Sequence, residues 1–197
     1  MRIGIFGGTF DPIHLGHLIV MQNSINYVNL DKIIVLPTSN PPHKLLNTKS
    51  DVSVRVEMVN AAIKCNKKLE LSTYESSSNE IHYSFNTMRH FKKVYPNDEL
   101  FYIMGEDSLR DIELWEKYKI LLSENNIIVF TRFKNDEDFK IILEKYKKIA
   151  KNIIVLDQVT TSISSTLIRE MVKNKLDINY LVPEEVEKII LSRNLYE

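Results

Sequence analysis

The segment with the clearest chemical content lies near the N-terminus and reads GGTFDPIHLGH (residues 7–17). It follows an apolar run that begins at Ile3, and the residues after it can form a helix. A glycine-rich turn between a strand and a helix brings bare backbone close to a ligand, and the helix N-terminus adds unpaired N–H groups that suit phosphate. His14 and His17, three residues apart, point toward the same place. The pattern indicates a nucleoside triphosphate held for chemistry at phosphorus.

The rest of the chain must supply the elements that position this segment. Strand-like and helix-like stretches alternate along the whole length, and several strand-like stretches are continuous apolar runs, as in strands covered on both faces. We expect strands at 2–6, 32–36, 69–72, 99–104, 126–130 and 152–156. We expect helices at 15–26, 52–64, 84–95, 112–122, 136–148, 165–173 and 184–191. The alternation predicts an α/β fold: a doubly wound, Rossmann-like parallel sheet with helices on both faces and ligands beyond the carboxyl ends of its strands.

Length, charge and cysteine content restrict the class of protein. A chain of 197 residues predicts one domain, residues 1–197. The 26 basic residues balance 26 acidic ones, so no basic field is available for nucleic acid. No apolar stretch approaches membrane-spanning length, and the one cysteine, Cys65, cannot form an internal disulfide; we expect no signal peptide. We expect a cytoplasmic protein without nucleic-acid or membrane partners; a homo-oligomer stays open.

Two further segments carry residues that bind anions. The segment 41–44 (PPHK) follows the second expected strand, and its prolines stiffen a loop that ends in an imidazole and the Lys44 ammonium. The alternative is a rigid surface turn with a solvated lysine. The segment 163–169 (ISSTLIR) is a serine-rich helix start followed by Arg169, which can hold an anion through N–H groups, hydroxyls and a guanidinium. The alternative is a capped surface helix with Arg169 in solvent.

The middle of the chain offers residues that could contact a nucleoside. Gly105 ends the fourth expected strand and lets backbone approach a ligand, while Asp107 could accept hydrogen bonds from ribose hydroxyls. The alternative is that Asp107 caps the next helix. Trp115 lies at helical spacing from Tyr118 and Leu122, and this spacing alone indicates a core stripe.

The motifs resemble those of a known family. Gly-x-Phe-Asp-Pro-x-His-x-Gly-His is similar to the signature of nucleotidyltransferases with a His-x-Gly-His motif, and its fuller form here is most similar to that of bacterial nicotinate-mononucleotide adenylyltransferases. The segments 41–44, 105–107, 163–169 and 180–186 also resemble that family and occur in the family's order. The resemblance implies an enzyme of NAD biosynthesis that joins ATP and nicotinate mononucleotide into deamido-NAD and releases pyrophosphate.

The resemblance also implies roles for individual residues. The catalytic set is His14, His17, Lys44 and Arg169. The ATP-binding set is Gly7, Gly8, Thr9, Phe10, His14, His17, Gly105, Asp107, Ile163, Ser165, Thr166 and Arg169. The mononucleotide-binding set is Gly8, Thr9, Lys44, Ser84, Phe85 and Trp115. We expect Mg²⁺ to bind through the substrate phosphates, with no dedicated metal ligands in the chain.

The chain departs from the family pattern at a few positions, and other functions stay open. The departures are His82, Ser84, Asn86, Glu106 and the segment 131–134 (TRFK, with Phe133), which replaces the family's Arg-Pro-Gly. Phosphopantetheine adenylyltransferases share the first motif but are shorter and lack the Pro-Pro-His-Lys segment. Another His-x-Gly-His nucleotidyltransferase, such as a cytidylyltransferase, would differ in its choice of base. A catalytically idle nucleotide sensor on the same fold would not require the complete phosphate-transfer set.

Overall fold

A computed structural model describes residues 1–39, 50–77, 81–131, 136–158 and 161–197 of the chain. The described strands are β1 (Arg2–Gly8), β2 (Lys32–Pro37), β3 (Leu69–Leu71), β4 (Glu99–Gly105), β5 (Asn126–Phe130) and β6 (Asn152–Leu156). They form one six-stranded sheet in the order β3-β2-β1-β4-β5-β6, and every neighbouring pair is parallel. The predicted doubly wound parallel sheet is therefore confirmed, and this strand order is the one that Rossmann-like folds use.

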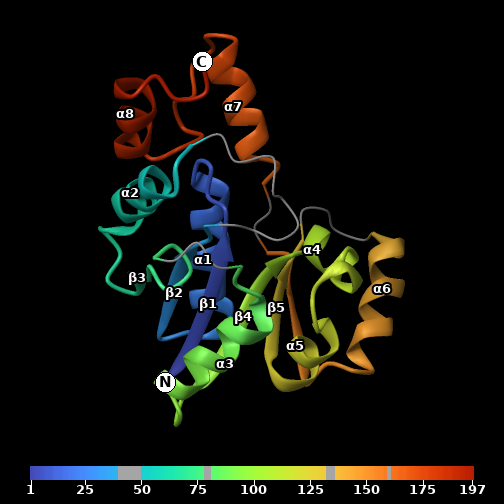
Figure 1. Cartoon of the computed structure of the whole chain (residues 1–197). Helices are drawn as coiled ribbons and strands as arrows, with labels where there is room; N and C mark the ends of the chain where they lie inside the picture. The colour runs from blue at the N-terminus through green and yellow to red at the C-terminus, as the bar shows by residue number, and fades with distance from the viewer. Residues whose placement is uncertain (40–49, 78–80, 132–135, 159–160) are drawn as a thin grey trace.

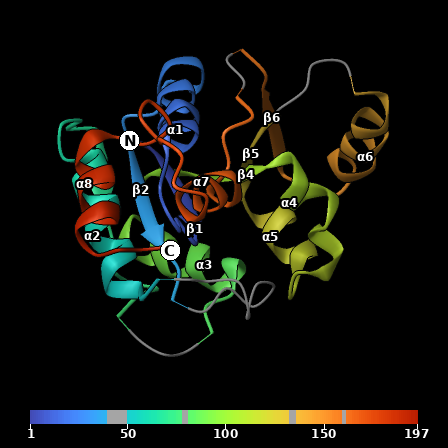
Figure 2. The ribbon, with the colours of Figure 1, turned by 90° about the horizontal axis from the view of Figure 1, so that it is seen from above.

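Helices connect the strands and cover both faces of the sheet. They are α1 (Leu15–Val28), α2 (Val52–Ile63), α3 (Ser84–Val94), α4 (Glu106–Arg110), α5 (Tyr118–Glu124), α6 (Glu137–Lys147), α7 (Ser165–Lys173) and α8 (Glu184–Ser192). In β1, Ile3 and Ile5 pack into a core with α3, α5 and α6. Phe6 belongs to the second core, under α1, α2, α7 and α8. Successive residues of a strand face opposite sides, so both faces must be apolar, as the continuous apolar runs predict. Figure 2 shows α1 and α3 on opposite sides of the sheet.

The prediction of one helix over 112–122 is wrong. The chain instead forms the short helix α4 directly after β4 and then a 3₁₀ turn at Ile112–Leu114. It is extended at Trp115 (φ −86°, ψ 134°), and α5 begins only at Tyr118. Lys117 has a left-handed backbone (φ 52°), which a continuous right-handed helix excludes. Trp115 therefore does not belong to a helical core stripe with Tyr118 and Leu122.

The sheet has its topological switch point between β1 and β4. These strands are neighbours, yet the helix that follows β1 lies on one face and the helix that follows β4 lies on the other. Figure 1 shows the N-terminus at the lower end of the sheet, with α7 and the C-terminus above its upper end. A crevice at the switch point is where folds of this kind bind ligands.

Among the described residues, none of the helices combines the length and apolar character that a membrane span requires.

Candidate active site

A cavity of about 230 Å³ opens at the carboxyl ends of β1 and β4. Its lining residues come from segments far apart in the sequence: Phe6–Phe10, His17, Tyr102–Ser108, Trp115, Phe130 and Ser165. The cavity lies at the topological switch point, and it gathers residues from the N-terminal motif, from the Gly105–Asp107 segment and from the start of α7. The sequence predicted this meeting from three separate motifs, so we take this cavity as the candidate active site.

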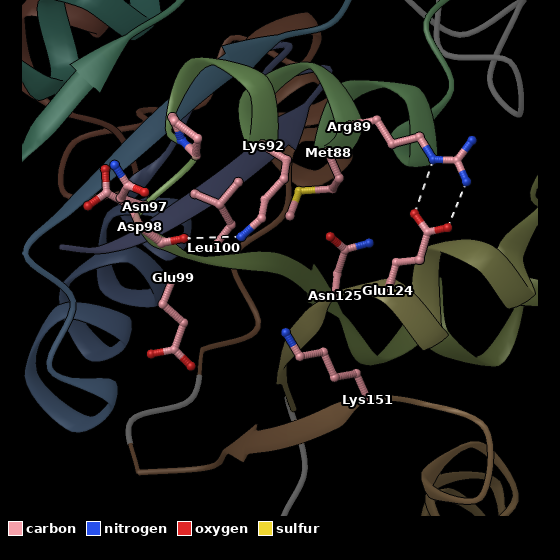
Figure 3. Close-up of a pocket in the computed structure, with 11 residues that line it drawn as sticks. Met88, Arg89, Lys92, Asn97, Asp98, Glu99, Leu100, Glu124, Asn125 and Lys151 are labelled. Carbon is pink, nitrogen blue, oxygen red and sulfur yellow. Dashed lines mark hydrogen bonds and ion pairs between the residues drawn. The ribbon is translucent and has the colours of Figure 1, made fainter.

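A larger cavity, of about 380 Å³, lies at the opposite end of the strands, where β4 and β5 begin. Figure 3 shows that Arg89 and Glu124 face each other there, and two hydrogen bonds of 2.6 and 3.1 Å join them. Lys92 donates to the Asp98 carbonyl at 3.4 Å. The charged side chains around this cavity include both cations and carboxylates, and none of the predicted site residues lines it. Its size alone does not make it the site.

The two glycines of the first motif end β1 and do not form the turn that the sequence predicted. Gly7 and Gly8 pair with Leu36 and Pro37 of β2 in the parallel ladder. The left-handed residue of the turn is Phe10 (φ 50°), whose side chain is only 2% exposed. A Cβ on Gly8 would lie 2.9 Å from the Phe10 ring. Gly8 is therefore required for the close packing of Phe10 against the strand end, and this packing shapes the wall of the cavity.

His14 and His17 open α1 and lie together, as their spacing predicted. Their rings stack with centroids 3.7 Å apart. The His14 backbone N–H donates to His17 Nδ1 at 3.2 Å, so the neutral His17 imidazole carries its proton on Nε2 and can donate from there. His17 lines the cavity, whereas His14 is 6% exposed and packs behind it. A Cβ on Gly16 would lie 2.9 Å from His14 Nδ1, so any residue other than glycine would displace the His14 ring.

The start of α7 is joined directly to the N-terminal motif. Ser164 caps the helix by accepting a hydrogen bond of 3.2 Å from the Leu167 N–H. Ser165 Oγ donates to the Pro12 carbonyl at 2.9 Å. Arg169 donates to the Asp11 carbonyl at 2.7 Å and to Thr166 Oγ1 at 3.2 Å. The alternative that left Arg169 in solvent on a surface helix is therefore wrong, since Arg169 fastens the loop between β1 and α1.

Beside the cavity, Tyr102 of β4 contacts both Ser84, which begins α3, and Trp115, which follows the 3₁₀ turn. Ser84 does not cap α3, since Tyr83 holds the N-cap position and the Ser84 hydroxyl lies 2.9 Å from the Tyr102 hydroxyl. Phe85 is 5% exposed, so its side chain belongs to the core and only its backbone can meet a ligand. The rings of Tyr102 and Trp115 meet edge to face, with centroids 6.3 Å apart. Burial raises the pKa of the Tyr102 phenol, which therefore stays neutral.

Glu106, which departs from the family pattern, is held in an ion pair. It is 6% exposed, and its Oε1 accepts from Arg110 at 2.5 and 3.0 Å. Arg110 also donates to Asp136 at 2.7 Å, so the pair is tied to the start of α6. Asp107 lies in the first turn of α4 and lines the cavity, where the sequence placed it.

Arg55 holds the loop between β1 and α1 through buried hydrogen bonds, and the sequence motifs did not include this residue. Its side chain is 1% exposed and donates to the carbonyls of Thr9 at 2.6 Å and Thr38 at 2.8 Å. Burial lowers the pKa of its guanidinium, while the Asp11 carboxylate acts in the opposite direction. One signal could have found it: Arg55 shares helical spacing with Met58 and with Val59, which places it on the apolar stripe of α2.

Glu75 is a second buried charged group near the site that the sequence did not point to. It is 6% exposed and accepts hydrogen bonds from Thr38 Oγ1 at 3.0 Å and Thr87 Oγ1 at 2.6 Å. It therefore ties the end of β2 to α3. Burial raises the pKa of the Glu75 carboxyl above its ordinary value of 4.5, and the two threonine hydrogen bonds oppose this shift.

The raised pKa of Glu75 predicts a pH dependence of stability. As pH rises above 4.5, the unfolded chain loses this proton first while the folded protein retains it. The unfolded state then binds fewer protons, so the free energy of unfolding falls until the folded carboxyl has also ionised. Urea denaturation across this range should show the fall in the wild type and its loss in Glu75→Gln. Glu144→Gln, on the exposed face of α6, should keep it; equal curves for wild type and Glu75→Gln would contradict the assignment.

The remaining predicted residues fall into three groups: outside the described residues, against the core, and along the cavity. Lys44, with the rest of the segment 41–44, and Phe133 lie outside the described residues. Ile163 is half-buried and packs against the core beneath α7, one residue before the cap. Of the predicted ATP-binding residues, Gly7, Gly8, Thr9, Phe10, His17, Gly105, Asp107 and Ser165 line the cavity.

A parallel sheet with this strand order, and a switch-point cavity that joins a donor imidazole to a serine of a helix start, define a nucleotide-binding protein of the nucleotidyltransferase class. The cytidylyltransferase-like family model matches residues 5–171. A "Probable nicotinate-nucleotide adenylyltransferase" of Clostridium botulinum (strain Alaska E43 / Type E3) is 43% identical over 199 residues, covering 100% of this chain and 98% of the relative. The chain belongs to the nicotinate-nucleotide adenylyltransferase family, which confirms the resemblance seen in its motifs.

Other known proteins agree with this placement. A protein of the same name from Clostridium tetani (strain Massachusetts / E88) is 40% identical over 194 residues, covering 98% of this chain and 97% of the relative. The solved structure of Plasmodium falciparum nicotinic acid mononucleotide adenylyltransferase complexed with NaAD matches with a TM-score of 0.82 and 25% identity, covering 99% of this chain and 97% of that one. The fold is thus shared over almost the whole length.

Proposed function

We propose that this protein transfers the adenylyl group of ATP to nicotinate mononucleotide, giving deamido-NAD and pyrophosphate. The observation that carries this proposal is the cavity at the switch point, where His17, Ser165 and Trp115 meet from three distant segments. Full-length relatives named for the same activity support it. The protein is accordingly an enzyme of NAD biosynthesis.

The chemistry places modest demands on the protein. The 5′-phosphate of the mononucleotide is already an anion, so it can attack the α-phosphorus of ATP in line without a protein base or a covalent intermediate. The bond from the α-phosphorus to the bridging oxygen breaks, and pyrophosphate leaves with that oxygen. The protein must position the two substrates and stabilise charge on the equatorial and leaving oxygens.

Three groups of the chain fit this task. His17 Nε2–H can donate to a phosphate oxygen in the cavity, with His14 stacked behind it to fix the ring. Arg169 and the start of α7 add a guanidinium, hydroxyls and N–H groups for the phosphate chain. We assign Lys44 to the same phosphates on the family resemblance alone.

Magnesium belongs to this proposal as a companion of the phosphates. Among the described parts of the chain, no three His, Cys, Asp or Glu side chains gather closely enough to hold a metal ion. We propose that Mg²⁺ takes its ligands from phosphate oxygens and water, where it would neutralise the charge of the triphosphate.

One assay tests the proposed function directly. Pyrophosphate release from ATP would be measured with nicotinate mononucleotide, with its amide, with phosphopantetheine and without an acceptor. We expect release with the acid mononucleotide, and at least roughly tenfold less with the amide, since an amide NH₂ opposes the N–H groups of the α3 start and each unpaired donor costs about 1–3 kcal/mol. If only phosphopantetheine gave pyrophosphate release, phosphopantetheine would be the acceptor substrate. If ATP bound but no acceptor gave pyrophosphate release, the protein would be a nucleotide sensor.

Trp115, the single tryptophan, gives a prediction for the pyridine ring. It is half-buried and lines the cavity, so its indole face can stack on the positively charged pyridinium, which is worth about 0.5–2 kcal/mol. Nicotinate mononucleotide should therefore quench the tryptophan emission, and Trp115→Ala should raise the KM for the mononucleotide several-fold while unfolding stays cooperative. Emission that the mononucleotide leaves unchanged would assign ring recognition to another residue.

Arg169 gives a separate prediction for the phosphate side. Arg169→Lys keeps the charge but loses the planar fork that holds the Asp11 carbonyl and Thr166 together. We expect weaker binding of ATP and pyrophosphate, measured by calorimetry, with binding of the mononucleotide largely spared. Equal losses for both substrates would place Arg169 outside the triphosphate site.

A further inference from the structure

The Asp11 side chain is the centre of a buried hydrogen-bond network that the proposed function does not use. Asp11 is 2% exposed, and its Oδ1 accepts a hydrogen bond of 2.8 Å from the Tyr196 hydroxyl and a second one from Ser50 Oγ. The two hydroxyl oxygens lie 3.4 Å from each other. Three segments thus meet at one carboxylate: the loop after β1, Ser50 just before the N-cap of α2, and the segment after α8.

The backbone of the same loop is held from other directions. Arg55 donates to the Thr9 carbonyl, and Arg169 donates to the Asp11 carbonyl. These bonds fix the peptide groups on both sides of Asp11, whereas the two hydroxyls fix its side chain. Three residues after Asp11 the chain reaches His14, which caps α1 and holds His17 through a backbone hydrogen bond.

Tyr196 places a neutral hydrogen-bond donor at this contact. Its backbone has a left-handed conformation (φ 69°), which is uncommon for an aromatic residue. Burial, with the adjacent Asp11 carboxylate, raises the pKa of the Tyr196 phenol. The hydroxyl therefore stays a neutral hydrogen-bond donor at physiological pH.

We propose that Tyr196 is a positioning residue of the active site: its hydroxyl, together with that of Ser50, holds the Asp11 carboxylate and thereby sets the place of the His14–His17 pair. The proposal rests on the proposed function. A displacement of about 1 Å at a reacting group can cost about 10²-fold in rate. Loss of one of the two donors to Asp11 should therefore affect kcat more than substrate binding.

The test is a kinetic comparison of single-atom variants. In Tyr196→Phe we expect kcat for pyrophosphate release to fall roughly tenfold, with KM for ATP and the mononucleotide within about twofold of wild type. Tyr180→Phe is the matched control, because the Tyr180 side chain is 89% exposed and its hydroxyl does not bond to Asp11, and it should keep wild-type kcat. Ser50→Ala removes the other donor and should repeat the kcat loss, which keeps the test decisive if Tyr196→Phe fails to fold.

A double-mutant cycle distinguishes action through Asp11 from a general structural role. Asp11→Ala removes the acceptor of both hydroxyls, so if Tyr196 acts through Asp11, Asp11→Ala with Tyr196→Phe should be no slower than Asp11→Ala alone. Multiplied effects, or unchanged kcat in both Tyr196→Phe and Ser50→Ala, would overturn the proposal. Imidazole ¹⁵N–¹H spectra of the ligand-free protein add a readout without turnover: the His17 signals should shift in Tyr196→Phe and stay in place in Tyr180→Phe. This readout separates failure of the positioning role from failure of the proposed reaction.

Discussion

Replacement of His17 by alanine should lower kcat by about 10²–10³-fold, the loss expected when one preorganised donor to transition-state charge is removed. The structure supports this size of effect, because the imidazole lines the cavity and the His14 N–H fixes its tautomer and orientation. Binding of ATP should change less than kcat, since the donated bond strengthens as charge develops.

Stability should change little in this variant. The substitution removes the acceptor for the His14 N–H, which is one hydrogen bond worth about 0.5–1.5 kcal/mol. His90→Ala is the matched control, because His90 stacks on Tyr74 at 3.8 Å and lies outside the lining of the cavity. Steady-state pyrophosphate release is the measurement. A folded His17→Ala protein with near-wild-type kcat would remove His17 from the reaction.

Replacement of Arg55 by methionine should give the largest loss of stability among these variants. The thioether fills similar space but cannot donate to the carbonyls of Thr9 and Thr38. Each buried acceptor left without a donor costs about 1–3 kcal/mol, so the free energy of unfolding should fall by about 2–5 kcal/mol. Urea denaturation measures this fall.

The control for Arg55→Met is Arg89→Met. Arg89 donates two hydrogen bonds to Glu124 in an exposed ion pair, and such pairs contribute about 0–1 kcal/mol. Equal losses in the two variants would mean that burial of Arg55 adds nothing to its hydrogen bonds. A loss of activity in Arg55→Met at temperatures where it is fully folded would further link Arg55 to the loop.

The fold could be predicted because its main signal is local. Strands covered on both faces must be apolar at successive positions, and runs such as Ile127–Phe130 state this directly. The region around Trp115 was predicted wrongly for the same reason. Helical spacing joined Trp115 to Tyr118, whereas the left-handed Lys117 and the contact of Trp115 with Tyr102 decide the structure, and spacing carries no information on either.

The candidate site was predictable where its residues form continuous motifs. The stacked pair His14 and His17 follows from a helix start and a spacing of three residues. Arg55 and Tyr196 were missed because each acts on a loop that is distant in the sequence: Arg55 on Thr9 across 46 positions and Tyr196 on Asp11 across 185. Such contacts exist only once the sheet has brought the segments together.

The distance between the loop and its supports has a consequence for synthesis. The ribosome makes Asp11 and the histidines before β2 to β6, but the groups that fasten them, Arg169 and Tyr196, are made after α6 and β6. In a nascent chain whose α7 has not yet left the ribosome, both histidines are present without these contacts. Contacts of such long sequence separation form late in folding, because loop closure costs entropy before they stabilise anything. We therefore expect catalytic competence to arise only after α8 has been made, when all six strands of the sheet are already available.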